Sequence, residues 1–209
     1  MEPPRSLPAR LYLLAYDLGR GKLTGHHAVA VRAAALEDLR LQGHLSDDAG
    51  KVRVRDPRPL ADPVLDAVLR ETGQGRPRPW KHWVAAHSRQ TARAVRDQLD
   101  DRLYVRVEHR RILGIFPHTA VTAREPRVIE QLQRTAVQAL TRGPAVSHVD
   151  PHEAALVAFA ALAQFDSIFP RRMRREHKTR IAEFVDRVTP LAPALKKVID
   201  DIHAASAGG

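Results

Sequence analysis

The side chains whose chemistry is most evident in this sequence are arginines. Arg89, Arg93 and Arg96 are spaced i, i+4 and i+7, so on a helix they project from one face. A guanidinium presents a planar fork of N–H donors that meets two oxygens of a phosphate at once. The spacing therefore predicts a cluster of guanidinium groups suited to a phosphate ester. The same three residues also fit the solvated side of an ordinary amphipathic helix.

A second cationic run covers residues 171–180, with the sequence RRMRREHKTR. Such a run is either a second surface for phosphate or a solvated helix face. The whole chain carries 34 Lys and Arg against 24 Asp and Glu, a formal net charge of +10 at pH 7. A basic balance of this size favours acidic partners such as phospholipid head groups or nucleic acid.

The other motifs with chemical potential are weak. His148 and His152 are four residues apart, but Pro151 begins a helix between them, so they do not share a helical face that would hold a metal. The chain has no cysteine, which excludes disulfides and thiolate ligands. It has no phosphate-cradling glycine loop and no nucleophile elbow. We therefore expect no catalytic residues, no metal and no cofactor, and a protein that is not an enzyme.

Any contact with a membrane is expected to be peripheral. The N-terminus lacks the charged-then-apolar pattern of a signal peptide. The longest uncharged apolar run, 154–163, is well short of the roughly 18 residues that span a bilayer. The lack of cysteine favours a reducing compartment, and the preference for Arg over Lys together with abundant Ala suggests a GC-rich bacterial genome. We expect a cytoplasmic protein associated with the inner face of the membrane.

The elements that must position these side chains are mostly helices. Apolar periodicity and capping residues predict helices over 25–42, 63–73, 80–86, 88–103, 128–140, 151–169, 172–188 and 193–205. Alternation predicts a short strand over 51–55 and a β-hairpin over 104–116, with its turn at 109–111. The fold class is therefore mainly α: a single helical-bundle domain over 7–205, with surrounding amphipathic helices and a β-hairpin insertion. Residues 1–6 and 206–209 are expected to be disordered tails.

The hairpin is the candidate for self-association. Its alternating apolar side chains need covering if they are exposed, which predicts a homo-oligomer. The residues expected to make this contact are Val105, Val107, Ile112, Leu113, Ile115 and Phe116.

This order of elements, with several local sequences, resembles the lipid-binding domain of the Golgi phosphoprotein 3 family, including its bacterial relatives, over residues 7–203. The segments that carry the resemblance are 11–17 (LYLLAYD), 31–45 (VRAAALEDLRLQGHL), 62–66 (DPVLD), 110–117 (RRILGIFP) and 150–157 (DPHEAALV). The resemblance implies a helical bundle, a β-hairpin used in self-association and a basic pocket for phosphatidylinositol 4-phosphate on a flat face. It implies no catalytic activity.

The resemblance also implies which residues form that pocket. Arg32 matches an arginine of the first long helix, and either Arg89 and Arg93 or Arg93 and Arg96 match two arginines of a later helix. Leu23 stands where the family has a Trp, so an aromatic wall of the pocket is missing. With Lys22 beside it, Leu23 is expected at the pocket edge.

We therefore predict a peripheral membrane protein, a non-catalytic adaptor that binds anionic head groups of the phosphatidylinositol 4-phosphate type, with its protein cargo unidentified. An alternative is a winged-helix-like nucleic-acid-binding protein, since Arg106, Arg110 and Arg111 make the hairpin basic. Long apolar helices continue well past the length of a winged-helix domain, so nucleic acid is the less favoured partner.

Overall fold

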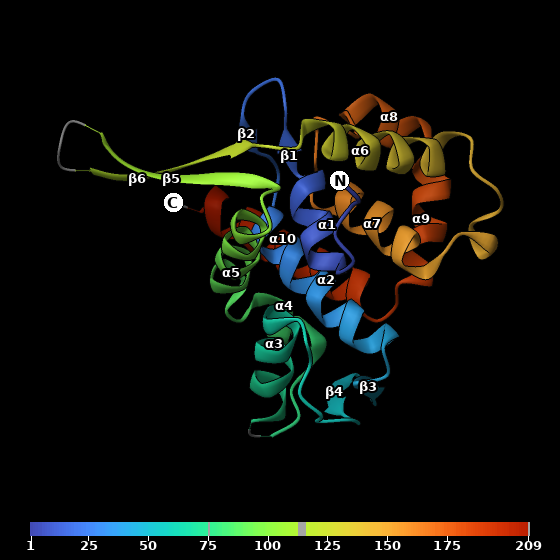
Figure 1. Ribbon diagram of the computed structural model, residues 1–209. Helices are drawn as coiled ribbons and strands as arrows, with labels where there is room; N and C mark the ends of the chain where they lie inside the picture. The colour runs from blue at the N-terminus through green and yellow to red at the C-terminus, as the bar shows by residue number, and fades with distance from the viewer. Residues whose placement is uncertain (75, 113–115, 209) are drawn as a thin grey trace.

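The computed structural model describes residues 1–74, 76–112 and 116–208, with the backbone alone at 109–112 and 116–118. It confirms a mainly α fold, about 60% helical, whose described strands form small antiparallel pairs (Figure 1). In chain order the elements are α1 (Leu7–Leu14), β1 (Tyr16–Asp17), β2 (Lys22–Leu23), α2 (His27–Leu41), β3 (Leu45–Asp48), β4 (Lys51–Val54), α3 (Pro63–Gly73), α4 (Trp80–Ala85), α5 (Ser88–Asp101), β5 (Val105–Ile112), β6 (Phe116–Ala123), α6 (Pro126–Thr141), a 3-10 turn (Val146–His148), α7 (Pro151–Leu162), α8 (Arg171–Glu176), α9 (Lys178–Arg187) and α10 (Leu191–Ala207).

Helix α2 runs through the centre of the molecule, with α1, α3, α4, α5, α7 and α10 packed around it (Figure 1). Residues 29–39 are buried on every side, and the alanines among them let neighbouring helices approach closely. Asp38 is buried as well, and its Oδ2 accepts a hydrogen bond of 2.7 Å from the backbone N–H of Leu7. This bond fixes the start of α1 on α2.

The predicted helix over 151–169 is too long. Helix α7 ends at Leu162, and Gln164 follows in the left-handed region with φ 59°. The carbonyl of Ala163 then accepts a 2.8 Å hydrogen bond from the N–H of His26, which ties the end of α7 to the start of α2. Phe165 and Phe169 are fully buried beyond it, so tertiary packing ends the helix although local periodicity would continue it. The predicted helix over 172–188 is likewise divided, at His177, into α8 and α9.

The β5–β6 hairpin projects away from the helical body at the left of Figure 1. Its antiparallel register runs from Val105 opposite Ala123 to Ile112 opposite Phe116. The predicted turn at 109–111 is wrong, because these residues are paired within β5. Pro117 lies inside β6, which a two-stranded ribbon tolerates because every strand has an outer edge that needs no N–H donor.

The two chain ends differ in their contacts with the domain. Pro4 and Ser6 are buried, and the Tyr104 hydroxyl donates a 2.7 Å hydrogen bond to the Glu2 carbonyl, so residues 2–6 contact the domain while Met1 is exposed. At the other end, α10 continues as a helix to Ala207.

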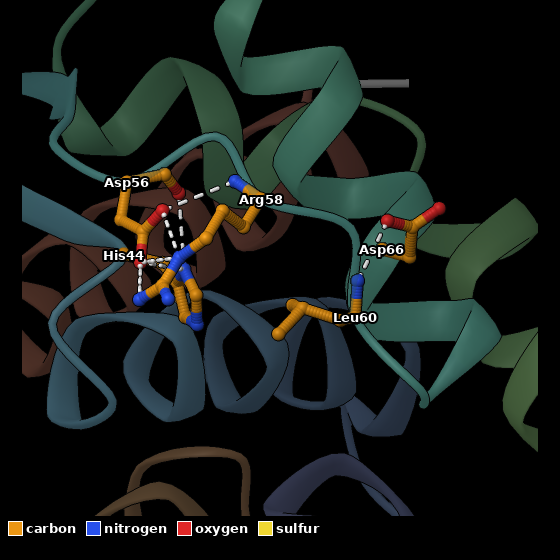
Figure 2. A network of polar contacts seen from close by, with 5 residues as sticks. All are labelled: His44, Asp56, Arg58, Leu60 and Asp66. Carbon is orange, nitrogen blue, oxygen red and sulfur yellow. Dashed lines mark hydrogen bonds and ion pairs between the residues drawn. The ribbon is translucent and has the colours of Figure 1, made fainter.

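A polar network shapes the loop between β4 and α3 (Figure 2). His44 contacts the Asp56 carbonyl at 3.0 Å, the Asp56 carboxylate binds Arg58, and Asp66 accepts a 3.1 Å hydrogen bond from the N–H of Leu60. This loop delivers the chain to the start of α3. There Asp62 caps the helix by accepting from the N–H groups of Val64 and Leu65, as its place before Pro63 predicts.

Helix α3 is also tied to α5. The side-chain amide of Gln98 on α5 donates a 3.0 Å hydrogen bond to Oδ2 of the same Asp62. The two helices are thereby held beside each other on α2, which places Glu71 of α3 next to Arg32.

Candidate functional site

Helix α5 carries the exposed arginines. Thr91, Ala92, Val95, Gln98 and Leu99 form its buried side, so the opposite side faces solvent. Arg89 and Arg93, one turn apart, are both exposed, as their spacing predicts. Neither has a carboxylate partner within the part of the chain that the structure describes.

Arg96 differs from these two because its guanidinium is already paired. Its Nε donates a 2.8 Å hydrogen bond to Oδ1 of Asp97, and its Nη2 lies 2.7 Å from the same oxygen. Only 16% of the Arg96 side chain is exposed. Burial raises the pKa of the Tyr12 phenol, and the nearby positive charge of Arg96 offsets part of that rise. The predicted cluster of three free guanidinium groups is therefore reduced to Arg89 and Arg93.

Arg32 lies inside the protein. Its side chain is 0% exposed, its Nε donates a 3.0 Å hydrogen bond to the Trp83 carbonyl, and its Nη1 donates one of 3.0 Å to the Thr91 hydroxyl. Nη1 also lies 2.8 Å from Oε2 of Glu71, in an ion pair. Burial lowers the pKa of Arg32 and the negative charge of Glu71 counteracts this, so the guanidinium stays charged.

The expectation that Arg32 faces a lipid head group is therefore wrong. Helices α3 and α4 cover the side of α2 that carries it, and a charge buried there has to be neutralised and hydrogen-bonded by the protein itself. Sequence reasoning missed Glu71 as its partner. No local pattern signals this pair, because the two residues are far apart in the chain.

Lys22 and Leu23 lie in a different place from the arginines of α5. They line a hollow of about 630 Å³ that we call the β1–β2 hollow. Its other lining residues come from the β1–β2 turn and from the segment after α7: Asp17, Gly19, Arg20, Thr24, Gly25, Gln164, Asp166 and Ser167. Two carboxylates accompany its two cations, and Leu23 packs partly against the core. The six residues predicted to form one pocket are therefore not gathered in one hollow.

The predicted self-association residues are also distributed differently. Val105 is fully buried and Val107 packs partly against the core, so the base of the hairpin is covered by its own domain. Helix α5 provides part of that cover, and its Asp100 accepts a 3.3 Å hydrogen bond from the N–H of Val107. The role predicted for Val105 is therefore wrong, because its side chain is not accessible to a second copy, whereas the role of the partly buried Val107 stays a prediction. Of the other four, Leu113 and Ile115 lie outside the described residues, and the side chains of Ile112 and Phe116 are outside the description as well.

The residues that the structure describes contain no group of three or more His, Asp or Glu side chains placed to hold a metal ion. None of their helices has both the length and the apolar character needed to cross a bilayer.

Comparison with known proteins identifies the domain. No curated protein sequence matches the chain. The family model described as Golgi phosphoprotein 3 (GPP34) matches residues 7–202, which is nearly the whole chain and includes the helices that follow the hairpin. With its mainly helical fold built around α2 and its β5–β6 hairpin, the chain belongs to the Golgi phosphoprotein 3 family.

Proposed function

We propose that this protein binds the phosphate-bearing head groups of anionic phospholipids, as a non-catalytic peripheral protein, through the exposed side of α5. The observation that carries the proposal is the pair Arg89 and Arg93. Both are exposed, they are one helical turn apart, and neither is neutralised by a carboxylate among the described residues. Two such guanidinium groups match the oxygens of a phosphomonoester in charge and in hydrogen-bonding geometry.

Electrostatics supports peripheral docking. A basic residue near an anionic leaflet contributes about 1 kcal/mol of binding free energy, so two exposed arginines together with the net charge of +10 favour measurable, salt-sensitive association. Membership of the Golgi phosphoprotein 3 family supports binding to phospholipid head groups, because the domain that this chain resembles is lipid-binding. The family match extends from α1 into α10. The proposed location is the inner face of the cytoplasmic membrane. There the protein would act as an adaptor that holds a protein cargo.

Arg32 takes a positioning role in this proposal. Its hydrogen bonds to the Trp83 carbonyl and the Thr91 hydroxyl join α2 to the end of α4 and the first turn of α5. Arg89 lies in that same turn, between these two contact points in the chain. The buried guanidinium of Arg32 on α2 therefore supports the helix whose outer side carries the exposed arginines.

The proposal is tested by comparing two polyanionic surfaces. Purified protein is co-sedimented with neutral phosphatidylcholine vesicles and with vesicles that also contain phosphatidylinositol 4-phosphate, cardiolipin or phosphatidylinositol. The same preparation is assayed for a gel shift on random duplex DNA, because DNA phosphates would attract the same cations. We expect binding to at least one anionic vesicle at a salt concentration where DNA is not shifted. Binding to DNA together with no binding to any anionic vesicle would refute the proposal in favour of a nucleic-acid-binding protein.

A further inference from the structure

A second cationic surface lies on α8 and the start of α9. Arg171, Arg174, Arg175 and Lys178 line one hollow of about 430 Å³, which we call the α8–α9 hollow. All four lining residues are cations. Their spacing of i, i+3, i+4 and i+7 keeps them on one side of the chain although the helix is interrupted at His177.

The nearby carboxylates do not neutralise this hollow. Glu176 accepts a 2.7 Å hydrogen bond from Arg172, a side chain that is 90% exposed and does not line the hollow. Asp166 lies 2.5 Å from Nη1 of Arg174 and compensates that one charge. Arg171, Arg175 and Lys178 have no carboxylate partner in the residues that the structure describes.

Packing does not explain why these residues are basic. Helix α8 has no buried residue, and only Met173 and Arg174 have their side chains partly turned inward. An exposed six-residue helix needs polar side chains, but it does not need three cations that share one hollow with a fourth from α9.

The backbone that carries the hollow is firmly attached to the domain. Phe169, directly before it, is fully buried, and its carbonyl accepts a hydrogen bond from Arg174. After it, Arg180 does not line the hollow and donates hydrogen bonds to the carbonyls of Ala139 in α6 and Pro144 in the following loop, at 2.8 and 2.6 Å. Anchoring on both sides means that the four cations are brought together before a ligand arrives, so less conformational entropy is lost on binding.

We propose that the α8–α9 hollow is a binding site for a phosphate-bearing anion with two or more negative charges. Three uncompensated cations around one space favour a multiply charged ligand over a single carboxylate. Arginine forks suit the oxygens of a phosphate, and Lys178 adds a mobile point charge. Such a group occurs on a soluble di- or polyphosphate and on a phosphorylated lipid head group. The site is separate from the α5 arginines and does not depend on the proposed docking function.

The test uses inorganic pyrophosphate as the soluble probe, with binding measured by isothermal titration calorimetry on the full chain at low salt. We expect saturable binding with one site per chain. Arg175→Ala and Arg171→Ala should each weaken it about fivefold, the equivalent of one near-surface cation. Arg172→Ala is the matched control, since it removes the same charge from the same helix without touching the hollow, and it should leave the affinity unchanged. Circular dichroism melts confirm that each variant is folded.

The source of the phosphate is decided by a second arm with anionic vesicles. A loss of vesicle binding in Arg175→Ala alongside the loss of pyrophosphate binding assigns the hollow to a lipid head group. If Arg175→Ala loses affinity for pyrophosphate but binds vesicles like the parent, the hollow is assigned to a soluble ligand. If the protein shows saturable binding to neither pyrophosphate nor anionic vesicles, the proposal is overturned. It is also overturned if Arg172→Ala and Arg175→Ala lose equal affinity, because the ligand would then be attracted to the overall charge of the protein. The double variant Arg89→Ala with Arg93→Ala changes only the α5 surface. Its binding to vesicles therefore tests the docking function independently of the α8–α9 hollow.

Discussion

Nη1 of Arg32 lies 2.8 Å from Oε2 of Glu71, in an ion pair whose arginine is completely buried and whose glutamate is 29% exposed. Helix α2 supplies the cation and α3 the anion, while α4 and α5 complete the surroundings through the Trp83 carbonyl and the Thr91 hydroxyl. The pair therefore connects four helices through one guanidinium. This connection determines what removing either partner should do.

Replacing Glu71 with Ala should destabilise the fold by about 2 kcal/mol, because a buried guanidinium loses its counter-charge and partial exposure of Glu71 moderates the cost. The measurement is urea unfolding followed by circular dichroism. Glu183→Ala is the control, since Glu183 is an exposed glutamate on α9. The double variant Arg32→Met with Glu71→Leu should recover most of the loss, because it leaves no buried charge unpaired. A Glu71→Ala variant as stable as the parent would show that Arg32 does not rely on this ion pair.

Gly25 should not tolerate a side chain. Its φ is +58°, and a Cβ built on it would lie 2.2 Å from the carbonyl oxygen of Ala163. Gly25→Ala should therefore lower the free energy of unfolding by more than about 2 kcal/mol. Gly50 has a similar backbone, with φ +81°, and nothing within 4 Å of its built Cβ, so Gly50→Ala should show only the backbone cost of about 1 kcal/mol. Equal losses in thermal melts of the two variants would argue against close packing of α2 on the end of α7.

Acidification should destabilise the fold through two histidines at the start of α2. Burial lowers the pKa of His26, and His203, whose Nε2 lies 3.0 Å from Nε2 of His26, lowers it further. Burial also lowers the pKa of His27. Both bind protons less readily in the folded state than in the unfolded chain, where a histidine has a pKa of about 6.5. Their stabilising contribution is therefore complete above that value and is lost as the pH falls below it.

The measurement is the urea midpoint over a pH series from neutral to mildly acidic, for the parent and for His26→Gln with His27→Gln. The variant should show the weaker dependence on pH. Comparing the two proteins at each pH cancels the contribution of other groups such as Glu37, whose pKa burial raises. Identical slopes in the two proteins would contradict the role given to these histidines.

The pKa of Asp56 should depend on Arg58. Hydrogen bonds from the Arg58 side chain and backbone lower the pKa of Asp56 from 3.8 to about 2 (Figure 2). The contribution of this carboxylate to stability is therefore present above its unfolded pKa and is lost as the pH falls toward 2. Arg58→Ala should move the pKa back toward 3.8, as measured by NMR titration of the carboxyl carbon. A pKa that stays near 2 in the variant would mean that another group holds it.

Features governed by neighbouring residues are predictable from this sequence. Asp62 before Pro63 and Asp150 before Pro151 predict helix starts, and each aspartate accepts hydrogen bonds from two N–H groups of the first turn of its helix. The exposure of Arg89 and Arg93 follows from the apolar stripe on the other side of α5.

Features governed by tertiary packing are not predictable in this way. The resemblance alone assigns Arg32 to a lipid pocket, yet α3 and α4 cover it and Glu71 neutralises it. Helix α7 ends before its apolar pattern does, because Ala163 binds the start of α2 and Phe165 turns into the core. The hairpin register is also set at a distance, since α5 covers Val105 and Tyr16 donates a 3.0 Å hydrogen bond to the Val121 carbonyl.

The most direct test of the central claim is co-sedimentation of Arg89→Ala with Arg93→Ala on the anionic vesicles that bind the parent protein. The control is Arg58→Ala with Arg70→Ala, which removes two exposed arginines that are already paired, with Asp56 and Asp66. We predict that the α5 variant loses about 2 kcal/mol of binding free energy, roughly 30-fold in affinity, and becomes less sensitive to salt. The control should bind like the parent. Equal binding by both variants would contradict the assignment of α5 as the membrane-binding surface.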